Sequence, residues 1–424
     1  MDNSLLKGAS SRLQTAATLM VCLLIVSVPL FPRPFVSNID IVTVMLPLVL
    51  LVAVLLLLAQ PGRLKALWYR PFGIAAALFL AWGLISILVT RSGVGELLTW
   101  ARYLSYFLLI FAVGLIASSS KGRTIVLWAL VIAGVGAALY GLYQLLNPQI
   151  MSDMFAADAG IKVRIYSTFD NPNFFSEFLL LSICGSIALF GRYWKKSTSA
   201  CAVIIAATLL QLLVLFLTYT RGSLLALAAG LVVGVLVFRP KLVAPLAAII
   251  VLAGLIPPVF ARFKGALAVD GTTEFRLGLW RVATTAIREK PLSGGGLGDF
   301  YQIYGSVVRR HPALYQGYSQ FGAHNSYLQL AAETGIIGGL LFLGAVGSLV
   351  WAGIRTARRI KSKRLAFQNA ALLAGVVGFI LNALTSDSFQ HPHAAVYFFI
   401  LSGLLLGLES SDWRRNQRSA EPAS

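Results

Sequence analysis

A single histidine stands where a long polar segment meets a long apolar run. His324 lies in the sequence Gly-Ala-His-Asn-Ser-Tyr at 322–327, and the apolar run that follows extends to about residue 353. Imidazole titrates near neutral pH, which makes histidine the most frequent general base in enzymes. His324 is therefore a candidate base for a substrate hydroxyl. An interfacial histidine with a structural hydrogen bond would occupy the same position.

Two further charged residues stand in or beside apolar runs. Glu333 follows His324 by nine residues, so on a helix it would lie roughly 13 Å deeper. A carboxylate at that depth must face other helices or a wet cavity, and a structural role is the favoured interpretation. Arg221 occupies the short turn Thr-Tyr-Thr-Arg-Gly at 218–222 between two apolar runs. It can either extend to lipid head groups or bind an anion.

Other basic residues gather in two long polar segments, at about 147–172 and 261–323. Arginine matches phosphate oxygens with a two-pronged hydrogen-bonding group, so these segments can bind a phosphate-bearing ligand. Contact with anionic lipid head groups explains the same composition more simply. The basic residues concerned are Lys162 and Arg164 in the first segment and Arg276, Arg281, Arg288, Lys290, Arg309 and Arg310 in the second.

Several kinds of chemistry lack the residues they need. The cysteines Cys22, Cys184 and Cys201 do not have metal-ligand spacing. The sequence contains neither a phosphate-binding loop of the Walker A type nor an Asp-x-Asp pair in the two long segments. We therefore expect no metal and no cofactor, and we disfavour ATP hydrolysis and metal-dependent sugar transfer.

The composition places these residues in a membrane protein. Of the 424 residues, 58% are hydrophobic and 12% are charged, about half the charged fraction of a soluble domain. The formal charge of +19 would favour nucleic-acid binding in a soluble protein. Here it falls mainly in short loops between apolar runs, so we expect no nucleic-acid partner.

The apolar runs predict an all-α integral membrane protein of about twelve transmembrane helices, with one large, partly helical loop. With the N-terminus inside, 21 basic residues fall on the inner side and five in the outer loops other than 261–323. The positive-inside rule then places both termini in the cytoplasm and His311, His324, His391 and His393 outside. The predicted spans are 15–32, 40–59, 72–90, 99–118 (which contains Arg102), 124–146, 172–190, 199–219, 222–238, 242–260, 325–353, 366–385 and 394–409.

We expect one transmembrane domain over residues 1–413 and a polar cytoplasmic tail over 414–424. The outer loops would be 147–172 and 261–323. Within the larger loop the sequence predicts a helix from Thr273 to Glu289, followed by a break at Pro291 and a run of three glycines at 294–296.

Four motifs, which follow one another along the chain in the expected order, resemble the O-antigen ligase family. It belongs to a superfamily with O-antigen polymerases and bacterial O-linked oligosaccharyltransferases. The motif at 324–338 is His-Asn, nine residues, then Gly-Ile-Ile-Gly, and Thr-Arg-Gly at 220–222 resembles the start of the shared domain. The segment 276–298 resembles the opening of the large periplasmic loop, and 167–173 resembles a segment that precedes a helix. The resemblance covers roughly residues 160–405.

The resemblance implies a fold similar to that of type C glycosyltransferases and a reaction at the periplasmic face of the inner membrane. A polysaccharide would be transferred from undecaprenyl diphosphate to a sugar hydroxyl of lipid A–core, with inversion and without a metal. Membrane lipids would be further partners. His324 would be the base. Asp387 resembles a family acidic position and would orient His324 or an arginine. The diphosphate or substrate would be bound by Arg221, Arg276, Arg164 and Asn325, with Arg281 and Arg288 behind them, and Glu333 and Asn173 would support the site.

Ligase and polymerase share these motifs. A single dominant loop between the ninth and tenth predicted helices favours the ligase, with polymerase or O-linked oligosaccharyltransferase as the alternative. A transporter or flippase of lipid-linked sugars is the rival from another class, because membrane helices alone would fit it.

Overall fold

The computed structural model describes residues 3–31, 41–58, 71–91, 93–151, 163–256, 260, 271–317 and 322–418. It is 84% helical, and the described residues form no strand. Each of the twelve predicted spans contains a helix, although the ends of some, such as 257–259 in the span 242–260, lie outside the described residues. The helices are α1 (Asn3–Leu30), α2 (Ile41–Leu58), α4 (Pro71–Thr90), α5 (Val94–Ala117), α6 (Ser120–Leu146), α8 (Pro172–Tyr193), α9 (Thr198–Leu217), α10 (Arg221–Phe238), α11 (Val243–Leu255), α15 (Ser326–Arg359), α16 (Lys363–Asn382) and α17 (Pro392–Arg418).

Nine of these helices, counted over the described residues, are long and apolar enough to cross a membrane. A helix needs about 20 residues for the crossing, whereas α11 has 13 and the apolar part of α17 is Pro392–Leu408. The chain is thus an all-α, multi-pass membrane protein, as predicted. Helix α17 continues to Arg418, past the predicted start of the tail at residue 414.

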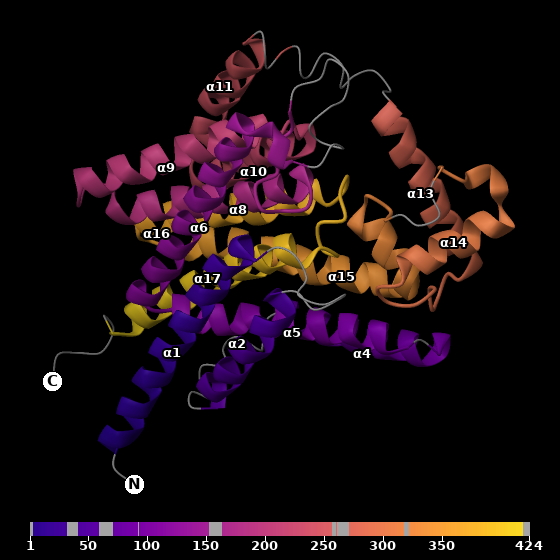
Figure 1. Ribbon diagram of the computed structural model, residues 1–424. Coiled ribbons are helices and arrows are strands. Elements are labelled where there is room, and N and C mark those ends of the chain that lie inside the picture. The colour runs from indigo at the N-terminus through magenta and orange to yellow at the C-terminus, as the bar shows by residue number, and fades with distance from the viewer. Residues whose placement is uncertain are drawn as a thin grey trace.

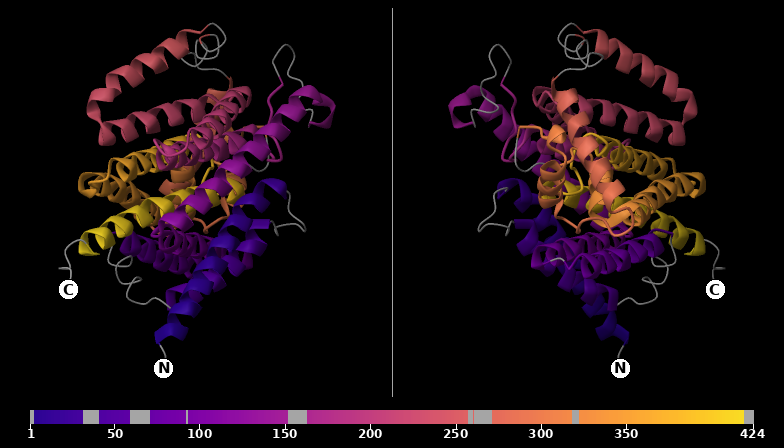
Figure 2. Two further views of the ribbon diagram at one scale, coloured as in Figure 1. Left: turned by 90° about the vertical axis from the view of Figure 1, so that its left-hand side faces the viewer. Right: turned by 90° about the vertical axis from the view of Figure 1, so that its right-hand side faces the viewer.

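Helices α8 and α16 form the centre of the bundle. In the most apolar 18-residue stretch of each helix, 83% of the residues are buried in α8 and 72% in α16. The corresponding shares are 22% in α9 and 28% in α10. Helix α10 packs closely against α16 because it has glycine at the contact. A side chain at Gly230 or Gly234 would collide with the backbone of α16 at Ala374 or Ala370. In both further views, α9, α10 and α11 lie on one side of this centre and α1 and α2 on the other (Figure 2).

Two helices outside the spans lie together at one end of the bundle (Figure 1). They are α13 (Gly271–Glu289), which the sequence predicted, and α14 (Phe300–Arg310), which it did not. They share a small core that includes Val282, Phe300 and Tyr304. The sequence did contain a signal for α14, since apolar residues recur at 300, 303, 304 and 307 with the period of a helix.

The glycine-rich segment after α13 docks on a kink in α15. The kink is at Gly335, whose backbone is not helical (φ +75°, ψ 174°). The Gly295 and Gly296 N–H groups donate to the carbonyls of Ala332 and Glu333, both at 2.9 Å. The Glu333 carboxylate accepts from the Gly298 N–H at 2.9 Å and from the Gln329 amide at 3.0 Å. Glu333 therefore fastens the large loop to the bundle, which agrees with the structural interpretation.

We expect Gly335→Ala to destabilise the protein by at least about 2 kcal/mol. Its backbone conformation is nearly restricted to glycine, and a Cβ would overlap the Leu292 carbonyl of the docked segment. Thermal unfolding of the purified protein measures the effect. Gly344→Ala and Gly347→Ala, in the same helix with open space around both positions, are the controls. Equal unfolding temperatures for all three variants would contradict the docking interpretation.

Candidate functional site

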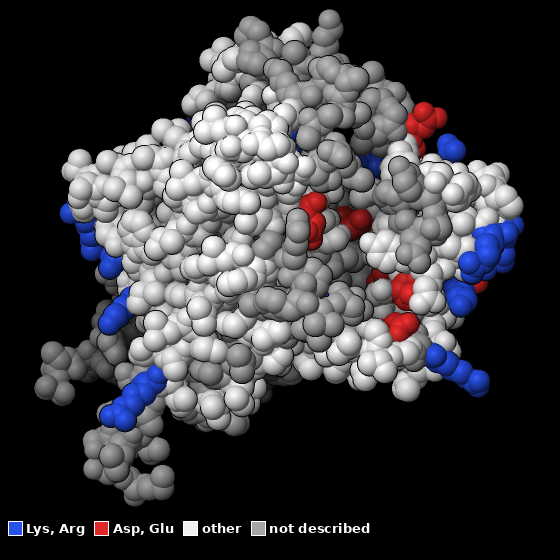
Figure 3. Space-filling view, in the orientation of Figure 1, with Lys and Arg blue, Asp and Glu red and all other residues white. Residues whose placement is uncertain are grey.

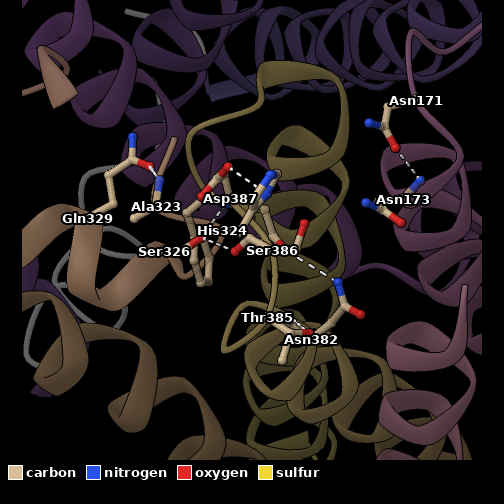
Figure 4. A network of polar contacts seen from close by, with 12 residues as sticks. Asn171, Asn173, Ala323, His324, Ser326, Gln329, Asn382, Thr385, Ser386 and Asp387 are labelled. Atoms are coloured by element: carbon tan, nitrogen blue, oxygen red, sulfur yellow. Dashed lines mark hydrogen bonds and ion pairs between the residues drawn. The ribbon is translucent and has the colours of Figure 1, made fainter. Parts of the chain in front are cut away.

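His324 pairs with a carboxylate from a distant part of the chain. Its Nδ1 lies 3.2 Å from Oδ2 of Asp387, which belongs to the turn between α16 and α17 (Figure 4). The Asp387 side chain is 7% exposed and the His324 side chain 24%. A buried carboxylate thus holds one ring nitrogen of a partly accessible histidine, the arrangement that orients a general base.

The turn that carries Asp387 is clamped to the start of α15 through Ser326. The Ser326 N–H donates to the carbonyls of Ala383 and Ser386, at 2.9 and 3.1 Å. The Ser326 hydroxyl donates to Ser386 O at 3.0 Å and accepts from the Phe389 N–H at 3.2 Å. These bonds fix the distance between the two elements that supply His324 and Asp387.

The backbone around His324 is constrained. His324 has φ +47°, a region that residues with a side chain occupy rarely. Gly322 has no room for a side chain, because a Cβ would collide with the Asp387 carboxylate. Non-glycine residues in such conformations persist only where the surrounding structure imposes them, often at functional sites.

Asn325 is the N-cap of α15. Its side-chain oxygen accepts from the N–H groups of Tyr327 and Leu328, at 3.1 and 3.0 Å, which satisfies two donors at the helix start. The structure thus gives Asn325 a capping role, and its contact with substrate stays a prediction.

Arg164 connects three elements near the first turn of α10. Its guanidinium donates to the Thr218 carbonyl at 3.2 Å and to Asn173 Oδ1 and the Thr220 hydroxyl, both at 3.4 Å. Asn173 lies in the first turn of α8, and Arg221 is the first residue of α10. Three predicted site residues, Arg164, Asn173 and Arg221, are therefore brought together by the α9–α10 turn.

The arginines of α13 lie at different distances from His324. The Phe275 ring is 6.4 Å from the His324 ring between centroids, so α13 begins beside His324, and the half-buried Arg276 follows directly. Arg281 and Arg288 are exposed and lie roughly 8 and 18 Å further along the helix than Arg276. The structure thus brings Arg276 toward His324 and places Arg288 away from it.

Two residues at this end of the bundle were not proposed for the site from the sequence. Arg102 of α5 lies close enough to His391 to affect its pKa. Glu177 of α8 is fully buried and accepts from the Asn382 amide at 2.8 Å and the Ser388 hydroxyl at 2.9 Å, so it braces the turn on both sides of Asp387. A charge inside an apolar run was the available signal for both Arg102 and Glu177.

We expect His391 to make the stability depend on pH. Burial lowers the pKa of His391 from 6.5 to about 4; Asp387 opposes the shift, and His393, His324 and Arg102 add to it. Between these two values the unfolded chain binds a proton that the folded protein does not bind. Stability should therefore fall as the pH is lowered through this window.

The test compares the unfolding free energy of the wild type and His391→Gln from pH 7 to pH 4. The variant should show a smaller slope by up to one bound proton. An unchanged slope in His391→Gln would rule out this assignment.

A polar cavity of about 760 Å³ lies between α13, α14 and α15. Its lining residues include Glu289, Asp299, Tyr301 and Arg310. Burial and the nearby Glu96 raise the pKa of Asp299 to about 6. In the space-filling view, carboxylates gather around the hollow between the bundle and this pair of helices (Figure 3).

The comparisons with known proteins concern the part of the chain that contains His324. Residues 206–343 match the family model described as O-Antigen ligase. A search of curated proteins gives no match. The matched region includes Arg221, Arg276 and His324, while Arg164, Asn173 and Asp387 lie outside it. The match supports the O-antigen ligase family and a function of the ligase or polymerase type. It covers three of the four motifs, and the segment 167–173 lies outside it.

Proposed function

With the match to the O-antigen ligase family as the premise, we propose that the protein is an O-antigen ligase. It transfers O-antigen polysaccharide from undecaprenyl diphosphate to a sugar hydroxyl of lipid A–core. The observation that carries the proposal is the His324–Asp387 pair, which lies beside the large loop at one end of the bundle. The proposed location is the periplasmic face of the bacterial inner membrane, with both termini in the cytoplasm, as the 21 basic residues on the opposite side favour.

In the proposed reaction His324 acts as the base. Its Nδ1–H donates to Asp387, which leaves the lone pair on Nε2 to accept the proton of the acceptor hydroxyl. The hydroxyl oxygen attacks the anomeric carbon of the donor. A new glycosidic bond forms while the bond from that carbon to the diphosphate oxygen breaks, and its electron pair leaves with the diphosphate. A single displacement of this kind inverts the anomeric centre.

Arginines stabilise the leaving group in this scheme. The diphosphate gains negative charge as the bond breaks, and guanidinium groups held in place before the reaction stabilise that charge without reorganisation. We assign this role to Arg221, Arg276 and Arg164, which three separate segments of the chain bring to the His324 end of the bundle. Arg281 and Arg288 lie further along α13 and would contact more distant parts of the donor or lipid head groups.

The experiment that tests this function is deletion of the gene and inspection of the lipopolysaccharide. A ligase mutant keeps polymerised O-antigen on the lipid carrier and loses it from lipid A–core. Collapse of the chain-length pattern to single repeats would show a polymerase instead, and loss of sugar from proteins alone would show an O-linked oligosaccharyltransferase.

A transporter of lipid-linked sugars remains the rival from another class. It would move its substrate without a base, so complementation of the deletion with His324→Gln separates the two. Restored lipopolysaccharide in that strain would overturn the enzymatic proposal. Accumulated carrier-linked polymer in the same strain supports it.

A further inference from the structure

A second cavity, of about 360 Å³, lies at the other end of the bundle. The ends of four helices surround it, and α8 and α16 contribute the ends opposite to those near His324. Since α16 has 20 residues, the two sites are roughly 30 Å apart. The cavity is lined by Ser118, Ser120, Arg123, Arg192, Ser362, Arg364, Leu365 and Gln368.

The described residues that line the cavity include three arginines and no carboxylate. The ion pairs within the described part of the chain join Glu289 to Arg310 and His311, and Asp387 to His324. None of them includes the cavity arginines Arg123, Arg192 and Arg364. Arg192 and Arg364 even lower the pKa of the neighbouring Lys196, because like charges disfavour its protonated form.

One of these arginines is buried. Arg123 is 4% exposed, and its guanidinium donates to the Ala117 carbonyl at 2.8 Å. The positive-inside rule acts through basic residues in loops and near helix ends and requires no buried guanidinium. Orientation in the membrane therefore explains the charge of this surface but not the burial of Arg123. The bond to Ala117, the last residue of α5, uses one of the five N–H donors of the guanidinium.

The polar groups of the cavity are suited to an anion. The first turns of α6 and α16 both contribute to its wall, and helix N-termini attract negative charge. Ser362, the N-cap of α16, makes no side-chain capping bond. Gln368 is 1% exposed, and its side-chain oxygen lacks a hydrogen-bond partner. This oxygen is an acceptor, so it requires a donor on the bound group, such as a hydroxyl, and not a phosphate oxygen.

We propose that this cavity binds a phosphate group, as a phosphomonoester or phosphodiester. Arginine forks and hydroxyl donors recognise phosphate oxygens, and a phosphate would supply the negative charge that the three guanidinium groups lack. The phosphate can come from a phospholipid head group in the adjacent leaflet or from a soluble phosphate ester. This site is separate from the proposed diphosphate site at the His324 end.

The test uses the delipidated, full-length protein in detergent. Thermal unfolding and native mass spectrometry follow the addition of phosphatidylglycerol, of diacylglycerol, which lacks the phosphate, and of inorganic phosphate. The cavity variant is Arg192→Gln/Arg364→Gln. The matched control is Arg355→Gln/Arg358→Gln, at exposed positions in the last turns of α15 near the same end of the bundle.

We expect phosphatidylglycerol to bind and stabilise the wild type and the control, and to bind at least about tenfold more weakly to the cavity variant. Diacylglycerol should have no effect. A similar response to inorganic phosphate identifies the free anion as a sufficient ligand, whereas a response to the lipid alone identifies a head group. The proposal is overturned if the cavity variant binds phosphatidylglycerol like the wild type, or if the control loses as much binding.

A second variant covers the possibility that the double substitution does not fold. Ser362→Asp introduces a favourable N-cap for α16 and also a carboxylate that repels an anion from the cavity. It should keep or raise the unfolding temperature and still lose phosphatidylglycerol binding. Wild-type binding in this variant would also overturn the proposal.

Discussion

The His324→Gln variant should lose transfer activity by roughly 10²- to 10⁴-fold, the contribution of a general base. Glutamine keeps a polar side chain of similar reach but cannot accept the proton of the attacking hydroxyl at neutral pH. The measurement is the rate of transfer from a lipid-linked donor to lipid A–core by the purified protein across a range of pH. The wild-type rate should depend on the titration of a base, and the residual rate of the variant should not.

The protein contains a matched control for this substitution. His311 lies directly after α14, and its Nε2 is 3.0 Å from Oε1 of Glu289, so it is a second histidine paired with a carboxylate. Its side chain is 48% exposed, and it belongs to the pair of helices outside the bundle. His311→Gln should retain nearly the full transfer rate. Equal losses in the two variants would show that neither histidine is a specific base.

Asp387→Asn should reduce the turnover number by about 10²-fold or more while leaving the fold intact. Asparagine has nearly the same shape, but it lacks the charge that orients a catalytic imidazole and stabilises it once protonated. Because Asp387 contacts His324 rather than the substrate in our proposal, KM for the donor should change little. The measurement is the initial rate as a function of donor concentration, with thermal unfolding in parallel.

Glu289→Gln is the control for Asp387→Asn. It removes the carboxylate of the His311 pair and leaves the buried His324 pair untouched. This variant should unfold at a slightly lower temperature, since Glu289 also pairs with Arg310, and should keep its turnover number. A large rise in KM with unchanged turnover in Asp387→Asn would instead indicate that Asp387 binds the substrate.

The sequence alone was sufficient to predict the membrane helices. Apolar runs of about 20 residues must form helices in a bilayer, because every backbone N–H and C=O has to be paired within the segment. Each of the twelve predicted runs contains a helix in the structure, and even the helix of the large loop begins within two residues of its predicted start at Thr273. Helix α14 was not predicted, although the apolar residues at 300, 303, 304 and 307 recur with the period of a helix.

The sequence also indicated which residue types could act, but it did not determine which of them meet. Histidine and arginine in the outer loops suggested base catalysis on a phosphate-bearing substrate, and the order of the motifs indicated the family. His324 and Asp387 are 63 residues apart in the chain, and no local pattern relates them. Only the clamp between Ser326 and the α16–α17 turn sets the distance between their side chains.

Tertiary structure likewise decided what the other singled-out residues do. Asn325 caps α15, Glu333 fastens the glycine-rich segment, and Arg164 bridges three elements. The binding roles of Asn325 and Arg164 stay predictions. A side chain selects its partner by distance and burial, and both depend on how helices far apart in the chain pack together. The spans were determined by the local requirement to satisfy the backbone in lipid, and the site was determined by packing between distant segments.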